Sequence, residues 1–181
     1  EEDGEDNGIG ESGSLVLSYI ASTDAVDRYG DIVEQQWELD GYQKNPVVLF
    51  NHRQDSLPIG KAKNIKVENN QLMIDIEFDM EDSEAARIAR KAKNGFLNAV
   101  SVGFQPLDFT PRAELPKDNK SYAEIGNIYH KSELLEVSIV TVPANSSATE
   151  QMTAAKFFSF GDFEDVFKSW NGKKAKTRFL S

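Results

Sequence analysis

Alternation of apolar and polar side chains with a period of two runs through much of the chain and predicts a β-rich protein. Residues 14–21 form the first predicted strand. Apolar side chains fall on both of its faces, so we expect both faces to be at least partly covered. Residues 59–78 predict a hairpin that turns at Asn69 and Asn70. After that turn every second residue is apolar: Leu72, Ile74, Ile76 and Phe78.

A shorter apolar run, NPVVLFNH, covers residues 45–52 and ends on one of only two histidines in the chain. Pro46 biases Asn45 toward extended backbone, which favours a short strand that leads directly to His52. Similar patterns predict three further strands, at residues 98–109, 121–130 and 133–143.

Two segments without hydrophobic periodicity are expected to be loops. Residues 22–34 are rich in aspartate, but the acid spacing does not match a calcium loop, whose ligands alternate around one cation. We expect a turn held by side-chain-to-backbone hydrogen bonds, with Arg28 available to pair with a neighbouring aspartate. Residues 111–120 contain two prolines, which predicts an exposed loop.

Helical spacing of apolar residues predicts three helices. The clearest begins at Asp82 or Ser83, either of which caps the first amides, and it ends at Gly95, which suits a left-handed stop. Ser147 and Glu150 form a capping box that predicts a second helix. The third is predicted from four apolar residues at helical spacing: Phe163, Val166, Phe167 and Trp170.

Several strands with only a few helices among them predict the α+β class, with an antiparallel or mixed sheet curled into a barrel. The length of 181 residues suits one domain, which we expect at residues 14–170. Residues 1–13 hold six acids and no base, and residues 171–181 hold four bases and no acid. We expect both ends to be solvated, flexible tails.

Composition excludes several classes of function. No apolar run approaches the roughly 18 residues needed to cross a bilayer, and no basic-then-apolar leader opens the chain, so neither membrane insertion nor export is expected. The net charge of -10 argues against nucleic acid as a main partner. With no cysteine, two histidines and no HExxH spacing, disulfides and a metal cofactor are not expected, and the chain fits a reducing compartment.

Three reactive side chains occupy strand positions at which the pattern predicts apolar residues. His52 closes an apolar strand, Ser101 lies inside AVSVGF, and Glu136 lies inside LLEVSIVTV. Alternation places Ser101 on a face of small residues, opposite a Val and Phe face that is expected to hold the core. A carboxylate at Glu136 costs several kcal/mol unless it is paired, so we expect it to have a partner.

Taken singly, each of these residues has a structural explanation: a satisfied hydroxyl, a surface imidazole, a strand glutamate bonded to a lysine or an amide. Together they fit nucleophilic catalysis. A serine hydroxyl needs a neighbouring base to take its proton, and the imidazole needs a third group to fix its tautomer and stabilise its charged form.

Four stretches make the sequence similar to the prohead serine proteases of tailed bacteriophages, whose fold is related to that of herpesvirus assemblin. They are DRYGDIVE, YQKNPVVLFNHRQDSLPIGKA, NAVSVGFQP after its helix, and ELLEVSIVTVPANSSA, spread over residues 22–148 in the family's order. The resemblance implies a small, mainly antiparallel β-barrel flanked by helices. It also implies His52 as general base, Ser101 as nucleophile and Glu136 as the acid that orients the histidine.

The third member of the implied triad has an alternative, because assemblin-like proteases use a second histidine in that role. His130 is the only other histidine here, and an unbroken strand would place it on the same face as Glu136, six residues later. Glu136 is preferred, since a carboxylate stabilises an imidazolium better than a neutral ring does. Two candidates for the donors of the oxyanion hole are left open: backbone amides near Gly103, and an arginine such as Arg112.

As an expectation from the resemblance, the protein is an endopeptidase in the host cytoplasm, inside the immature capsid, and works without a cofactor. It would cleave scaffold protein or the scaffold-like part of the major capsid protein, and also itself, and it would act as a homo-oligomer. The alternative is a non-catalytic assembly module that keeps the barrel and binds coat or scaffold protein.

Overall fold

A computed structural model describes residues 14–149 and 153–157 of the chain, and one mixed sheet is at its centre. Paired neighbours follow the order β2, β8, β4, β5, β6, β1 and β9, and β8 also pairs with β3 and β7. The strands of this described part are β1 (Leu15–Thr23), β2 (Ile32–Val33), β3 (Trp37–Glu38), β4 (Val47–Phe50), β5 (Gly60–Glu68), β6 (Gln71–Phe78), β7 (Ala99–Pro111), β8 (Asn127–Val140) and β9 (Thr153–Phe157).

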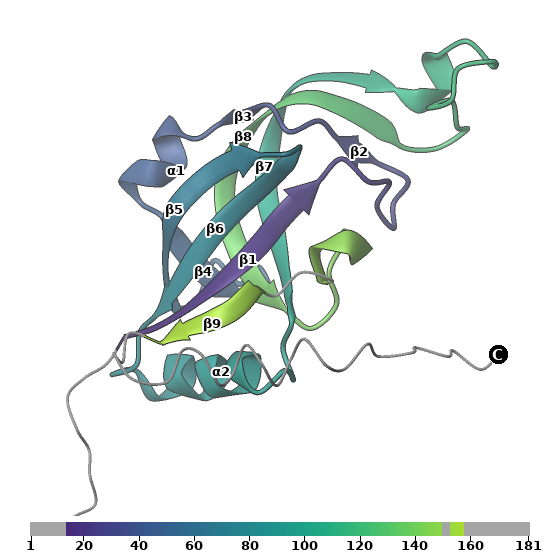
Figure 1. Ribbon diagram of the computed structural model, residues 1–181. Coiled ribbons are helices and arrows are strands. Elements are labelled where there is room, and N and C mark those ends of the chain that lie inside the picture. Colours follow the sequence, from purple (N-terminus) through teal and green to yellow (C-terminus); the bar gives the residue numbers. More distant parts are fainter. Residues whose placement is uncertain (1–13, 150–152, 158–181) are drawn as a thin grey trace, which may run out of the picture.

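The sheet curls into a half-barrel (Figure 1). Strand β7 comes close to β1 but pairs only with β8 among the described residues, so hydrogen bonds do not close the barrel there. The fold is thus mostly β with a few helices, compatible with the expected α+β class, and the complete barrel of the prediction is replaced by an open one.

The predicted hairpin is present as β5 and β6, which pair in antiparallel fashion around Asn69 and Asn70. Both asparagines adopt left-handed backbone, with φ of 53° and 56°, as a two-residue turn of this hand requires. The inward side chains of β6 are buried, and strand β1 covers its other edge. The sequence prediction for this region is confirmed.

Strands β7 and β8 form a long antiparallel hairpin that extends beyond the other strands at one end of the sheet (Figure 1). Val100 and Val137 on this hairpin are fully buried and belong to the core, as the alternation of β7 predicts. The pairing is irregular at three places, and one irregularity leaves Leu135 unpaired between Leu134 and Glu136. Each irregularity changes which face the following residues occupy.

Strand β4 lies parallel to β8, and this pairing positions the candidate site. Val48, Leu49 and Phe50 pair with consecutive residues 137–139 of β8. The chain reaches β4 through α1 (Asp40–Lys44), whose Tyr42 is buried and donates a hydrogen bond to the carbonyl of Val47 at 2.8 Å. Strands β2 and β3 are also parallel to β8, so the sheet is antiparallel in most but not all of its pairings.

Helix α2 (Ser83–Lys93) lies across one end of the curled sheet (Figure 1). Asp82 caps it by accepting a hydrogen bond from the amide of Ala85 at 2.7 Å, and Gly95 follows its end with φ of 78°. The apolar stripe is buried against the core: Ala85, Ile88, Ala89 and Ala92. This helix is confirmed, and no helix of the described part is long and apolar enough to cross a bilayer.

Other local predictions were wrong. The second helix is one 3-10 turn, η2 (Ser146–Thr149), followed by strand β9, because the edge of β1 offers β9 a pairing partner. The strand expected from residue 121 begins only at Asn127. The exposed loop predicted at residues 111–120 is present, except that Arg112, in the short turn η1 (Arg112–Glu114), is buried. The predicted tails at 1–13 and 171–181 and the helix at 163–170 lie outside the described residues.

Candidate active site

The turn after β4 holds His52 in an uncommon backbone conformation. Asn51 and His52 have φ of 52° and 58°, in the left-handed region that favours glycine. The amide of Asn51 donates to the carbonyl of Ile139 at 2.9 Å, and its side-chain oxygen accepts from the amide of Thr141 at 3.1 Å. Two hydrogen bonds to the end of β8 thus compensate for the strain of the turn.

Glu136 of β8 has the partners that its burial requires. The residue is 4% exposed, and its Oε1 lies 2.5 Å from Nδ1 of His52. Its second oxygen, Oε2, accepts a hydrogen bond from the Ser138 hydroxyl at 2.7 Å. Both carboxylate oxygens are therefore satisfied, and the contact to Nδ1 fixes one edge of the imidazole and leaves Nε2 for another partner.

Space for this carboxylate comes from Gly103 on β7, which pairs with Glu136. A Cβ added to Gly103 would lie 2.9 Å from Cγ and 3.0 Å from Cδ of Glu136, and closer still to Oε1. The irregularity at Leu135 turns Glu136 toward this glycine, while Leu134 pairs with Phe104, the next residue of β7. The small face of β7 is thus partly occupied by the protein's own acid.

Ser101 lies one strand away from this pair. It is 8% exposed, and it pairs across β7 and β8 with Ser138, which is itself bonded to Glu136. Directly opposite residues of such a pair have Cβ atoms about 4.5–5.5 Å apart. Among the described residues, no hydrogen bond joins the Ser101 hydroxyl to the His52 ring. The His52 side chain, 44% exposed, has room to reorient.

A small cavity of about 40 Å³ opens beside Ser101, between β7 and β1. Ala21 and Ser22 of β1 line it, together with Ala144 and Asn145 of the segment after β8. Asn145 donates to the Thr23 carbonyl at 3.3 Å, which ties that segment to β1. The serine is therefore partly accessible from the unpaired edge of β7.

His130 belongs to a second polar cluster. Its Nδ1 lies 3.1 Å from Oε2 of Glu34, and its Nε2 lies 2.9 Å from the hydroxyl of Thr110. The pairing of the strand between His130 and Glu136 is irregular, so the unbroken strand on which their shared face depended is not present. In the described part of the chain, His130 contacts neither His52 nor Glu136.

Tyr42 lies near the buried acid. Burial raises the pKa of the Tyr42 phenol, and the negative charge of Glu136 raises it further. The phenol is therefore neutral at physiological pH and keeps its hydrogen bond to the Val47 carbonyl. It helps to hold α1 against β4, below the turn that carries His52.

The side chains of Arg112 and Arg28 both donate hydrogen bonds to main-chain carbonyls. Arg112 donates to the carbonyls of Ser121 and Gly30 at 2.7 and 2.6 Å. Ten residues of strand separate it from Ser101, roughly 30 Å at 3.3 Å per residue. The option of Arg112 as an oxyanion donor is therefore wrong. Arg28 donates to the Pro143 carbonyl instead of pairing with an aspartate.

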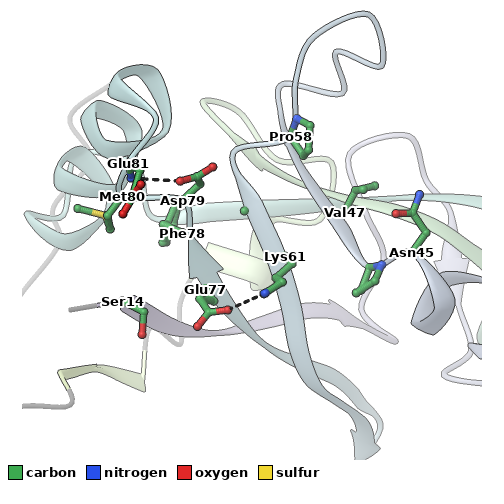
Figure 2. Close-up of a pocket in the computed structure, with 12 residues that line it drawn as sticks. Ser14, Asn45, Val47, Pro58, Lys61, Glu77, Phe78, Asp79, Met80 and Glu81 are labelled. Atoms are coloured by element: carbon green, nitrogen blue, oxygen red, sulfur yellow. Dashed lines mark hydrogen bonds and ion pairs between the residues drawn. The ribbon is translucent and has the colours of Figure 1, made fainter. Parts of the chain in front are cut away.

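A larger cavity of about 550 Å³ lies elsewhere, between the start of β5 and the segment leading into α2 (Figure 2). Lys61 and Glu77, paired on the neighbouring strands β5 and β6, form an ion pair of 3.4 Å at its lining, and Asp79 accepts a hydrogen bond from the amide of Glu81 (Figure 2). None of the three candidate catalytic residues lines it. No group of three or more side chains suited to a metal ion occurs among the described residues.

Sequence reasoning missed Ser138 and Asn51, which support the candidate residues, and it considered Gly103 only for the oxyanion hole and not as the space for Glu136. One signal was present: Ser138 follows Glu136 by two positions in an otherwise apolar strand, as if both belonged to one polar site. A β-rich domain in which an exposed imidazole contacts a buried carboxylate, one strand from a serine, has the elements of a serine hydrolase.

Comparison with known proteins agrees with that class. The family model described as caudovirus prohead serine protease matches residues 5–162. The prohead protease of Escherichia phage T5 is 31% identical over 91% of this chain and 74% of that protein. The prohead protease of Enterobacteria phage HK97 is 27% identical over 78% of this chain and 60% of that protein. A capsid polyprotein of Pseudomonas phage PAJU2 is 29% identical over 74% of this chain, but over only 19% of its own length.

No solved structure matches the chain. The family match covers well over half of the chain, so the protein belongs to the caudovirus prohead serine protease family and is a serine protease of capsid maturation. The relation in fold to assemblin stays a prediction.

Proposed function

We propose that the protein is an endopeptidase that cleaves its substrate through an acyl-enzyme at Ser101, with His52 as general base and Glu136 as the residue that orients His52. The observation that carries the proposal is the contact of 2.5 Å between Nδ1 of His52 and Oε1 of Glu136. It leaves Nε2 as the ring nitrogen available for a hydroxyl, and Ser101 lies on the neighbouring strand.

In the proposed mechanism, Nε2 of His52 takes the proton of the Ser101 hydroxyl as Oγ attacks the scissile carbonyl carbon. The tetrahedral intermediate collapses to an ester on Ser101, and the imidazolium returns its proton to the leaving amine. Water, deprotonated by the same nitrogen, then hydrolyses the ester and restores the serine. Glu136 stays ionised and stabilises the imidazolium throughout.

This mechanism requires His52 and Ser101 to come within about 2.6–3.2 Å of each other when substrate binds. Hydrogen bonds of this kind are often long or absent in a protease without substrate and form in the substrate complex. The His52 side chain is 44% exposed, so its ring is not enclosed by packing on the solvent side.

The proposed substrate is a scaffold protein or the scaffold-like part of a major capsid protein, and the proposed place of action is the interior of the immature capsid in the host cytoplasm. The relatives named prohead proteases support this proposal, as does the one named a capsid polyprotein. Self-cleavage and self-association belong to the same proposal. An isolated monomer that cleaves as fast per mole as a concentrated sample would contradict the self-association.

Labelling with a fluorophosphonate tests the nucleophile without a known substrate. The full chain should become labelled at Ser101, by peptide mapping, and Ser101→Ala should not. Thr110→Val is the control variant, because the Thr110 hydroxyl lies 2.9 Å from a histidine ring nitrogen, Nε2 of His130, without belonging to the proposed triad, and it should be labelled like the parent. Equal labelling of Ser101→Ala and the parent would refute Ser101 as the nucleophile. Absence of label on every variant would favour the non-catalytic assembly module.

A further inference from the structure

Ser138 occupies the centre of the candidate site. Its relative exposure is 0%, and it pairs with Leu49 of β4 on one side and with Ser101 of β7 on the other. It thus lies between the strand that leads to His52 and the strand that carries the candidate nucleophile. A fully buried hydroxyl at such a place needs hydrogen-bond partners.

The Ser138 hydroxyl uses both of its hydrogen-bonding capacities within the site. It donates to Oε2 of Glu136 at 2.7 Å and accepts from the main-chain amide of His52 at 3.0 Å. The donated proton and the accepted proton therefore connect the carboxylate and the backbone of the histidine through a single oxygen. No sequence prediction assigned a role to this residue.

Both connected groups have freedom that would spoil the contact between them. The terminal torsion of a glutamate has no sharp preferred angle, so one hydrogen bond to Oε1 does not fix the plane of the carboxylate. His52 has left-handed backbone, in which an amide without a partner would add to the strain. A fixed position for both groups thus depends on a third residue that contacts each of them.

We propose that Ser138 is a positioning residue for the catalytic pair: it holds the plane of the Glu136 carboxylate and the backbone of His52 in one arrangement, so that Nε2 is aimed toward β7. This inference rests on the proposed function of His52 and Glu136. Ser138 does not touch the substrate and transfers no proton. Its effect therefore falls on the chemical step rather than on substrate binding.

The test compares Ser138→Ala with Ser132→Ala. Ser132 lies on the same strand, is equally buried and has no hydrogen-bond partner for its hydroxyl, so it is a matched control. We expect Ser138→Ala to slow fluorophosphonate labelling by about 10- to 150-fold, the range for losing a hydrogen bond to a charged group. With a peptide substrate, kcat should fall by the same factor and KM should change less than about twofold. Ser132→Ala should change neither.

A conservative variant and a spectroscopic readout separate positioning from folding. Ser138→Thr keeps the hydroxyl and should recover most of the labelling rate. The chain has two histidines, so nitrogen-15 labelling of histidine gives two ring systems, with His130 as the internal reference. In Ser138→Ala the downfield Nδ1 proton of His52 should move or disappear, while the His130 resonances stay in place.

The outcomes distinguish this inference from the proposed function. If Ser101→Ala is labelled like the parent, the proposed function fails, and the ring resonances of His52 still decide whether Ser138 positions it. If Ser101→Ala loses the label but Ser138→Ala matches Ser132→Ala in rate and resonances, the role of Ser138 is refuted alone. Should Ser138→Ala not fold, Ser138→Cys keeps the side-chain volume with a weaker donor, and normal labelling of that variant would overturn the inference.

Discussion

Gly103→Ala tests the proposed site by adding one methyl group on the strand opposite Glu136. The added Cβ would lie 2.9 Å from Cγ and 3.0 Å from Cδ of Glu136. Gly103 is not among the residues with left-handed backbone, so alanine fits the conformation of β7. The expected response is that the glutamate side chain rotates away, which breaks its contacts with His52 and Ser138.

The magnitude follows from the contact that is lost. A hydrogen bond between charged groups contributes about 1.5–3 kcal/mol, and each 1.36 kcal/mol corresponds to a factor of ten in rate. We therefore expect kcat/KM and the labelling rate to fall by about 10- to 150-fold. In the free energy of unfolding, the lost hydrogen bonds are partly offset by the 0.5–1 kcal/mol that alanine typically gains over glycine in a strand, so the net change should stay within about 2 kcal/mol.

The assay combines the rate of fluorophosphonate labelling with thermal unfolding of the same samples. Gly41→Ala on α1 is the matched control, because its added Cβ would lie 3.0 Å from the end of another glutamate of β8, Glu133. It should leave the labelling rate unchanged. Full activity of Gly103→Ala, with its melting temperature unchanged, would show that the position of Glu136 does not matter for the reaction and would refute the reasoning.

Three further predictions test neighbouring features. Glu136→Gln should keep the fold and lower kcat by about 1000-fold or more, because an amide does not stabilise an imidazolium, and a loss below tenfold in steady-state cleavage would count against its role. Arg112→Met should lower the free energy of unfolding by about 2–4 kcal/mol in urea titration, since two carbonyls lose their donor; a large fall in labelling rate of the folded variant would contradict a purely structural role. Asn51→Ala should lower the free energy of unfolding by about 1–2 kcal/mol in the same titration and should also slow labelling. The reason is that the turn that holds His52 loses a hydrogen bond and a residue that tolerates left-handed backbone. An unchanged labelling rate and an unchanged stability would contradict this prediction.

Local patterns in the sequence determined the elements whose signals are short-range. The turn at Asn69 and Asn70, the cap at Asp82 and the stop at Gly95 depend on the chemistry of a few adjacent residues, and all three are present in the structure. Alternation along β7 correctly placed Ser101 opposite the core face, since side chains of one strand must alternate. The same reasoning required a partner for the buried Glu136, and it has two.

Beyond what the family resemblance implied, only the tertiary structure shows which of the two histidines meets that acid. The parallel pairing of β4 with β8 brings His52 to Glu136 across 84 residues of chain, whereas six positions of extended strand, roughly 20 Å, separate His130 from Glu136. Pairing partners and irregularities are set by hydrogen bonds between distant strands and leave no local signature. For this reason the nearer histidine in sequence lies in another cluster, and the distant one forms the contact.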